Sequence, residues 1–251
     1  MKSKNKEGDI KIDDKYLSDV MMNFLIAGRD TTAQALSWSL FLLCQHPDIQ
    51  EQVFQEARDT VQRNREAVAS GTPNPGEDEE ELLLREEDDE HISFENTKTM
   101  PYARAVFLET LRLYPSVPKE AKWAFEEDTL PDGTHIPKNC WVGFIPYVMG
   151  RDEHLWPEPQ RFDPGRFLAV DSETGVASTV KPSPYVFTAF QAGPRMCLGK
   201  DMAVLEGQVA LSRLCLNYKF SLACDPEEVT YTNSLTLPMK NGLPVRVEMR
   251  V

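Results

Sequence analysis

The 251-residue chain has no closely spaced cysteine pairs, no long uncharged apolar run and no excess of basic residues. Its cysteines are five in number and lack the spacing of zinc sites or redox motifs, which favours a reducing environment over a disulfide framework. The formal net charge of −13 argues against a surface that binds nucleic acid. Residues 1–14 are charged and lack the apolar core of a signal peptide, so the sequence does not indicate secretion.

The most apolar region, residues 20–43, is interrupted by Arg29 and Asp30. Charges in the middle of such a run are costly in lipid, so the region does not fit a membrane span. Apolar residues nevertheless dominate residues 15–43 without a proline, over a length that far exceeds a strand. We therefore predict one long helix over residues 15–43, buried on most of its faces and crossing the core.

Most of the negative charge lies in one segment, Glu77 to Glu90, where ten carboxylates face only Arg85 and so supply −9 of the −13. Such a run is more often a solvated, mobile loop than an acidic tail that binds a partner, and both interpretations stay open. We assign residues 64–93 to this acidic loop.

Two further helices are indicated on either side of the acidic loop. One begins at Pro47 and continues with an amphipathic pattern through Arg63. The next spans residues 100–114 and ends there, because Pro115 and Pro118 cannot continue a hydrogen-bonded helix.

The second half of the chain changes in texture. A turn at residues 131–133 predicts a hairpin between residues 122–128 and 134–145, and the proline-rich residues 151–184 are expected to be irregular. A fourth helix is expected from near Cys197 to about Leu216, followed by strands at residues 219–222 and 245–251 with a turn at Gly242. The expected fold class is mainly α with small β-sheets, an α+β arrangement.

The segment Phe190 to Gly199 carries the strongest chemical signal, since a glycine-bearing loop here delivers Cys197 to the first turn of an apolar helix. Unpaired N–H groups and the positive dipole end of a helix N-terminus stabilise a thiolate. Gly193 and Gly199 permit close approach to a flat ligand, and Arg195 is placed to bind an anionic group. An isolated cysteine is more often a small buried hydrophobe, but the surrounding pattern favours the ligand interpretation.

Two other patterns gain meaning from that loop. Ala27 to Thr32 places a glycine, a charge pair and two threonines inside the long helix, where a threonine hydroxyl bonded to a carbonyl one turn earlier opens the helix. By itself such a cluster is usually a satisfied kink. Glu109 and Arg112 lie three residues apart on one helix face, a pair that by itself is usually a solvated salt bridge.

These patterns resemble the motifs of the cytochrome P-450 superfamily of haem-thiolate monooxygenases. Residues 190–199 match its haem loop, Phe-x-x-Gly-x-Arg-x-Cys-x-Gly, at every defined position, and residues 27–32 are similar to its oxygen-activation motif. Residues 109–112 resemble its Glu-x-x-Arg pair. Residues 164–167 resemble its Pro-Glu-Arg-Phe segment, with Gly165 where the family often has glutamate. All four occur in the family's order.

The resemblance implies a role for each matched residue. Cys197 is the axial ligand of the iron of haem b (iron protoporphyrin IX), and Thr31 and Asp30 steady dioxygen and relay protons. Glu109, Arg112 and Arg166 form a structural network. The residues implied to contact the haem are Phe190, Gly193, Arg195, Gly199, Ala27 and Gly28, and those implied to line the substrate pocket are Val117, Pro118, Leu235 and Thr236.

The family's domain is much longer than this chain, so the resemblance implies that residues 1–251 are the C-terminal, haem-binding part of one domain, with the N-terminal half absent. Its named parts are the oxygen-binding helix (15–43), the acidic loop (64–93), the Glu-x-x-Arg helix (100–114), and the haem loop with its following helix (187–216). We expect a half-domain of this kind to expose apolar faces and to be poorly stable by itself.

The implied reaction is insertion of one oxygen atom from O2 into a C–H bond of an apolar substrate. The wording of residues 27–32 and 187–201 is closest to the fatty-acid ω-hydroxylase branch. Electrons would come from NADPH through a reductase. The intact parent would lie on the cytosolic face of the endoplasmic reticulum membrane, held only by an anchor in the missing N-terminal half.

Two other hypotheses compete with this one: a haem-binding remnant that turns nothing over, and a non-enzymatic scaffold whose acidic loop binds partners. The motif residues are intact, which argues against the scaffold.

Overall fold

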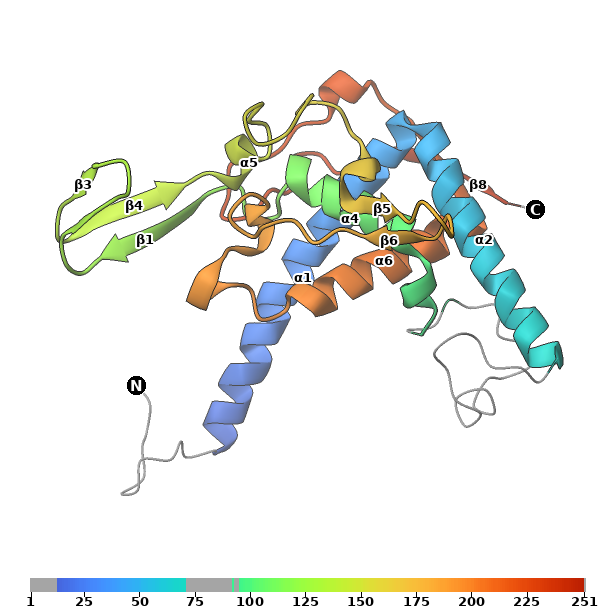
Figure 1. Cartoon of the computed structure of the whole chain (residues 1–251), viewed down its shortest axis with the longest axis horizontal. Coiled ribbons are helices and arrows are strands. Elements are labelled where there is room, and N and C mark those ends of the chain that lie inside the picture. Colours follow the sequence, from blue (N-terminus) through green and yellow to red (C-terminus); the bar gives the residue numbers. More distant parts are fainter. Residues whose placement is uncertain (1–12, 71–91, 93–94, 251) are drawn as a thin grey trace.

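The computed structural model describes residues 13–70, 92 and 95–250, and Figure 1 shows their arrangement. Four long helices make up the body of this part of the chain. They are α1 (Asp14–Gln45), α2 (Pro47–Ser70), α4 (Pro101–Leu113) and α6 (Lys200–Asn217). Short helices join them: η1 (Glu95–Thr99), α5 (Pro146–Met149), η2 (Pro164–Phe167), η3 (Thr188–Phe190), η4 (Gly193–Arg195) and η5 (Pro226–Glu228). The acidic run at residues 77–90 lies outside the described residues.

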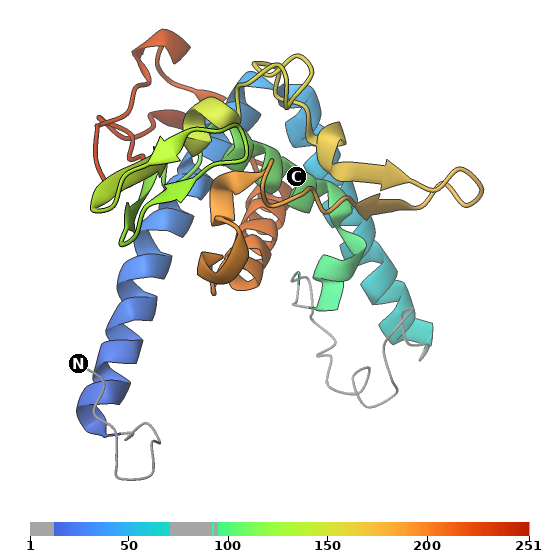
Figure 2. The same cartoon turned by 60° about the vertical axis from the view of Figure 1, so that its left-hand side comes forward.

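The strands form small antiparallel pairs rather than one sheet. The pairs are β1 (Glu120–Ala124) with β4 (Cys140–Phe144), β2 (Asp128–Thr129) with β3 (His135–Ile136), β5 (Leu168–Val170) with β6 (Ala177–Thr179), and β7 (Tyr218–Leu222) with β8 (Val245–Met249). Figure 2 shows the β1–β4 and β5–β6 hairpins extending from opposite sides of the helical body. The mixed fold with small sheets confirms the expected fold class.

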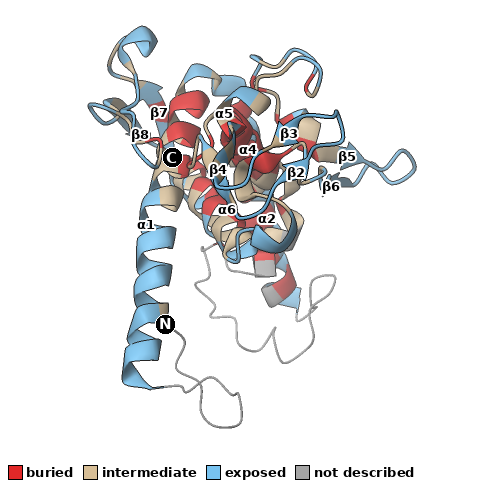
Figure 3. Ribbon diagram, turned by 90° about the vertical axis from the view of Figure 1, so that its left-hand side faces the viewer, coloured by how far each residue is buried: buried red, intermediate tan, exposed pale blue. Residues whose placement is uncertain are grey.

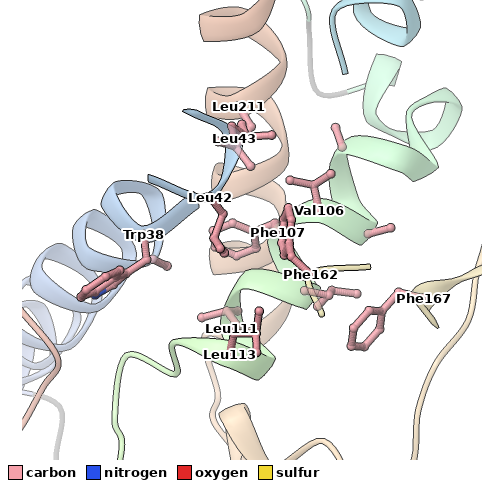
Figure 4. Packing of buried hydrophobic residues seen from close by; sticks show 14 of the residues in the cluster. Trp38, Leu42, Leu43, Val106, Phe107, Leu111, Leu113, Phe162, Phe167 and Leu211 are labelled. Carbon is pink, nitrogen blue, oxygen red and sulfur yellow. The ribbon is translucent and has the colours of Figure 1, made fainter. Parts of the chain in front are cut away.

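The core lies where α1, α4 and α6 meet. Leu42 of α1, Phe107 of α4 and Leu211 of α6 are buried in one apolar cluster (Figure 4). Burial of a leucine or phenylalanine side chain stabilises a fold by about 1.5–3 kcal/mol, so this cluster is the main source of cohesion among the helices. This cluster packs α1 against α6.

The first half of α1 corrects one expectation. The helix has nearly the predicted length, but it is buried only toward its C-terminal end, from Ala35 onward. Figure 3 shows the preceding turns almost entirely exposed. Residues 14–30 are almost all exposed, so their apolar side chains face outward. The large exposed ones are Tyr16, Leu17, Met21, Met22, Phe24, Leu25 and Ile26.

Three boundaries differ from expectation. Helix α2 continues to Ser70 instead of ending near Arg63, so residues 64–70 of the expected acidic loop are helical. The segment 151–184 is not wholly irregular, because it contains η2 and the β5–β6 hairpin. The third, the start of α6, is described with the site below. Among the described residues, no helix is long and apolar enough to cross a membrane.

Candidate functional site

Cys197 lies in the loop that precedes α6, not in its first turn. The helix begins at Lys200, with Gly199 as the N-cap, so the expected position of the cysteine was wrong by about one turn. The Cys197 N–H is not a free helix-terminal donor either, because it donates to the carbonyl oxygen of Phe190 at 2.8 Å. The contact closes residues 190–197 into a compact loop that contains η4, and Gly193 supplies a φ of +65° that favours glycine.

The loop presents Cys197 to the outside of the described structure. Its thiol is free and exposed, and the neighbouring Leu198 side chain is 90% exposed. Arg195 is also exposed and has no carboxylate partner within the described part of the chain. Phe190, by contrast, is half-buried and anchors the loop by an edge-to-face contact with Phe187. The loop thus exposes a soft sulfur ligand, a cation and an apolar side chain.

The oxygen-motif residues of α1 make the expected side-chain hydrogen bond, but the helix continues through them from Asp14 to Gln45 and is not opened there. The Thr31 hydroxyl donates to the Ala27 carbonyl oxygen at 2.7 Å, one turn earlier. The hydroxyl of Thr32 is buried and has no hydrogen-bond partner among the described residues. A Cβ built on Gly28 would meet no atom within 4 Å, so the helix surface there borders open space. These turns have room beside them and an unused polar group.

Asp30 is paired within the same helix. Its carboxylate accepts a hydrogen bond from Arg29 at 2.7 Å, and both side chains are exposed. The hydrogen bond from Arg29 holds the pKa of Asp30 below its usual range, so the group is ionised at neutral pH. At neutral pH Asp30 therefore carries a negative charge that is paired with the Arg29 guanidinium.

The loop that carries Cys197 and the helix that carries Thr31 are neighbouring segments. In Figures 1 and 2 the loop before α6 lies beside the exposed part of α1. A haem needs a thiolate for its iron, a cation for its propionates, apolar walls for its ring and a helix surface without protruding side chains. Cys197, Arg195 and Gly28 supply the sulfur, the cation and the open helix surface, and the exposed Leu198 adds apolar surface, so the residues present fit the group.

Glu109 and Arg112 of α4 form a fully buried ion pair, with both side chains 0% exposed. The guanidinium donates to both carboxylate oxygens, at 2.6 and 2.7 Å. Arg166 completes the expected trio: its Nε lies 3.4 Å from Glu109 Oε1 and its side chain is 12% exposed. That contact is an attraction between charges, since the Nε makes no directed hydrogen bond among the described residues.

The remaining donors of Arg112 bind the irregular segment that follows the hairpin. They reach the carbonyl oxygens of Gly150, of Pro159 at 2.8 Å and of Arg161 at 3.0 Å. Burial raises the pKa of the Glu109 carboxyl, while the two arginines and the Asp163 N–H, which donates to it at 2.8 Å, oppose that shift. The structure therefore brings the three network residues together, and their contacts link α4 to residues 150–166.

The expected pocket-lining residues lie in two segments tied to α1. Val117 and Pro118 are half-buried, while Leu235 is 77% exposed. The side chain of Gln34 in α1 donates to the Thr236 hydroxyl at 2.9 Å and accepts the Leu237 N–H at 2.9 Å. These segments are therefore positioned by the same helix that carries Thr31.

Sequence reasoning missed the residues that make these ties. The Ser116 hydroxyl donates to the Thr31 carbonyl oxygen at 2.7 Å, and the Ser116 carbonyl oxygen accepts the Leu237 N–H at 3.0 Å. Neither Gln34 nor Ser116 belongs to a motif, and their partners lie far along the chain. Gln191, which has a φ of 60°, was also passed over. The available signal for Gln34 was a long polar side chain in the largely apolar stretch after Thr32.

Comparison with known proteins agrees with this geometry. The cytochrome P-450 family model matches residues 1–244, and the chain belongs to that family. It is 39% identical to cytochrome P-450 704C1 of Pinus taeda over 249 residues, which is 98% of this chain and 45% of that protein. Identity to cytochrome P-450 704B1 of Arabidopsis thaliana is 37% over 246 residues, 96% of this chain and 45% of that protein. For cytochrome P-450 94A2 of Vicia sativa it is 32% over 240 residues, 95% of this chain and 41% of that protein. The chain thus spans less than half the length of these curated relatives.

Proposed function

We propose that this chain is the haem-binding part of a monooxygenase that inserts one oxygen atom of O2 into a C–H bond of an apolar substrate. The observation that carries the proposal is the exposed Cys197 thiol, held by a closed loop that lies beside α1, the helix that contains Thr31. Family membership supports the same reaction class.

Each site residue has a role in this proposal. Cys197 supplies the axial thiolate, and Arg195 neutralises a propionate as a charge-assisted donor. When bound, a haem with a thiolate ligand supplies the oxidation chemistry. Thr31 offers a hydroxyl that hydrogen-bonds oxygen in place of the Ala27 carbonyl oxygen. Asp30, ionised beside Arg29, accepts protons from solvent and passes them toward Thr31.

The substrate that we propose is a fatty acid or a related long-chain lipid, hydroxylated near its ω end. The amino-acid sequences of residues 27–32 and 187–201, which resemble the fatty-acid ω-hydroxylase branch of the family, support this substrate class. Exposed apolar side chains on α1 and on the segment that Gln34 ties to it, among them Leu25 and Leu235, favour a substrate with a long hydrocarbon part. Val117 and Pro118 would lie along the same wall.

The proposed electron source is NADPH, through a reductase. The proposed location of the intact protein is the cytosolic face of the endoplasmic reticulum membrane. The alternative is a haem-binding protein without turnover. It predicts the same spectrum as the monooxygenase but no hydroxylated product in the turnover experiment.

The proposal is tested by reconstituting the chain with haem and recording the absorption spectrum of the reduced, carbon-monoxide-bound form. A thiolate-type Soret band is expected. Cys197→Ser should abolish it, while Cys224→Ser, a half-buried cysteine outside the loop, should leave it unchanged. A band that survives Cys197→Ser overturns the ligand assignment.

Turnover is tested by joining the chain to the N-terminal part of a relative and supplying a reductase, NADPH and a long-chain fatty acid. A hydroxylated product supports the monooxygenase. A normal thiolate band with no product favours the inactive alternative.

A further inference from the structure

Gln191 has a backbone conformation that residues with side chains rarely adopt. Its φ of 60° and ψ of −175° lie in a region essentially restricted to glycine. It directly follows Phe190, whose carbonyl oxygen accepts the Cys197 N–H. A strained residue therefore stands at the point where the loop carrying Cys197 closes on itself.

The side chain of Gln191 is held at both ends by one strand. Its amide nitrogen donates to Glu120 Oε1 at 2.8 Å, and its amide oxygen accepts from Lys122 Nζ at 2.7 Å. Glu120 and Lys122 are alternate residues of β1 and so point to the same face of the strand. The donor and acceptor ends of a single amide are matched by an anion and a cation, an arrangement that neither alanine nor glutamate can reproduce.

We propose that Gln191 is a positioning residue. Its two hydrogen bonds to β1, here called the clamp, keep the strained turn in place and hold the loop where the Cys197 sulfur can bind a haem iron. The proposal deepens the proposed function and rests on it. Strain at Gln191 drives the turn to relax, and the hydrogen bonds to Glu120 and Lys122 oppose that relaxation. Gln191 acts on the sulfur through Phe190, by way of the Phe190–Cys197 hydrogen bond.

The clamp is tested first in the haem-free chain, by amide hydrogen exchange of the peptide that contains Cys197. Gln191→Ala keeps the strain and loses the clamp, so exchange in this peptide should rise about tenfold. Glu120→Ala removes one end of the clamp and should raise exchange in the same direction. Gln160→Ala, an exposed glutamine elsewhere, should leave it unchanged.

Gln191→Gly separates strain from clamp, since glycine adopts this conformation without cost. It should keep exchange within about twofold of the parent chain. Equal exchange in Gln191→Ala and Gln191→Gly overturns the proposal, and so does parent-like exchange in Gln191→Ala. Exchange that rises equally in α6, for instance at the Ala203 amide bonded to Gly199, shows general unfolding and also counts against a local clamp.

The second readout is the reduced, carbon-monoxide-bound spectrum of the haem-loaded chain. Gln191→Ala should lose most of the thiolate-type band, and Gln191→Gly should retain more of it. If the parent chain shows no such band, the proposed function fails, while the exchange data still decide whether the clamp exists. A parent-like band in Gln191→Ala contradicts the link from clamp to sulfur.

Discussion

The ring of Phe107 in α4 fills the space that a side chain on Gly207 of α6 would need. A Cβ built on Gly207 would overlap that ring, and both residues are buried. The absence of a side chain at Gly207 therefore sets how closely α4 and α6 approach. Through α6 it also sets where the loop ending at Gly199 meets the rest of the core.

We expect Gly207→Ala to lower the free energy of unfolding by about 1–3 kcal/mol, because overpacking forces backbone shifts in a dense core. Urea unfolding followed by circular dichroism measures the effect. Adding Phe107→Leu should recover part of the loss by making room. Gly28→Ala is the matched control: it lies in a helix, meets no neighbour, and should gain about 0.5–1 kcal/mol. A neutral Gly207→Ala would contradict the close approach.

Breaking the buried ion pair should be far more costly than breaking an exposed one. Glu109→Gln leaves the charge of Arg112 buried without its counter-ion and should destabilise the chain by about 3–5 kcal/mol. Thermal unfolding and soluble yield report this change. The control is Glu158→Gln, which breaks the exposed pair with Arg161 and should cost about 0–1 kcal/mol. Similar losses of unfolding free energy in the two variants would show that the buried network does not stabilise the fold more than an exposed ion pair does.

Stability should decrease as the pH rises from about 4.5 to about 7, because of Glu56. Burial raises its pKa from 4.5 to about 7, although the Tyr102 and Ala103 N–H groups donate to its carboxylate at 2.7 and 2.8 Å. The folded state therefore holds a proton that the unfolded state has released in this window. With partial exposure discounted, the loss is on the order of 2 kcal/mol.

The measurement is the urea midpoint as a function of pH in the parent chain and in Glu56→Gln. The variant should show a flatter profile between pH 4.5 and 7, since glutamine does not titrate. A decline of the same steepness in both chains would assign the pH dependence to other groups.

Gln34 should stabilise the segment that carries Leu235 and Thr236. Gln34→Leu removes two hydrogen bonds and leaves the Leu237 N–H with its one remaining acceptor, the Ser116 carbonyl oxygen. We expect a loss of about 1–3 kcal/mol and faster hydrogen exchange in residues 231–239. Gln45→Leu, in the same helix but with only a 3.5 Å contact to the Phe41 carbonyl oxygen, should change neither quantity much. Unaltered exchange in Gln34→Leu would sink this expectation.

The parts of the fold that follow from local pattern were predictable. The long helix was expected over residues 15–43 and lies at Asp14–Gln45, since a continuous apolar run of that length favours a helix wherever it packs. The end of α4 before Pro115 follows from proline chemistry. The continuation of α2 to Ser70 did not, because residues 64–70 form a helix without an obvious apolar stripe.

The site was predictable in its motifs and not in its supports. The pairing of Glu109 with Arg112 follows from helical spacing, but the contact between Gln191 and β1 joins residues that local pattern cannot relate. A positive φ at a glutamine has no signal of its own, since that residue rarely adopts it. The start of α6 at Lys200 was missed because Gly199, which is the N-cap of the helix, was interpreted only as a point of close approach to a ligand. The roles of Thr31 and Asp30 stay predictions.

Helix α1 has a C-terminal part that is buried in the core and an N-terminal part that is exposed (Figure 3). Isolated helical stretches of this size are marginally stable in water. The exposed part is therefore expected to unfold locally more often than the buried part. Residues 27–32 lie close to the boundary between them. Whatever binds there must select the wound form, and its apparent affinity falls in proportion to the fraction of chains in which those turns are formed. Anything that covers the exposed part would therefore tighten binding without touching the ligand.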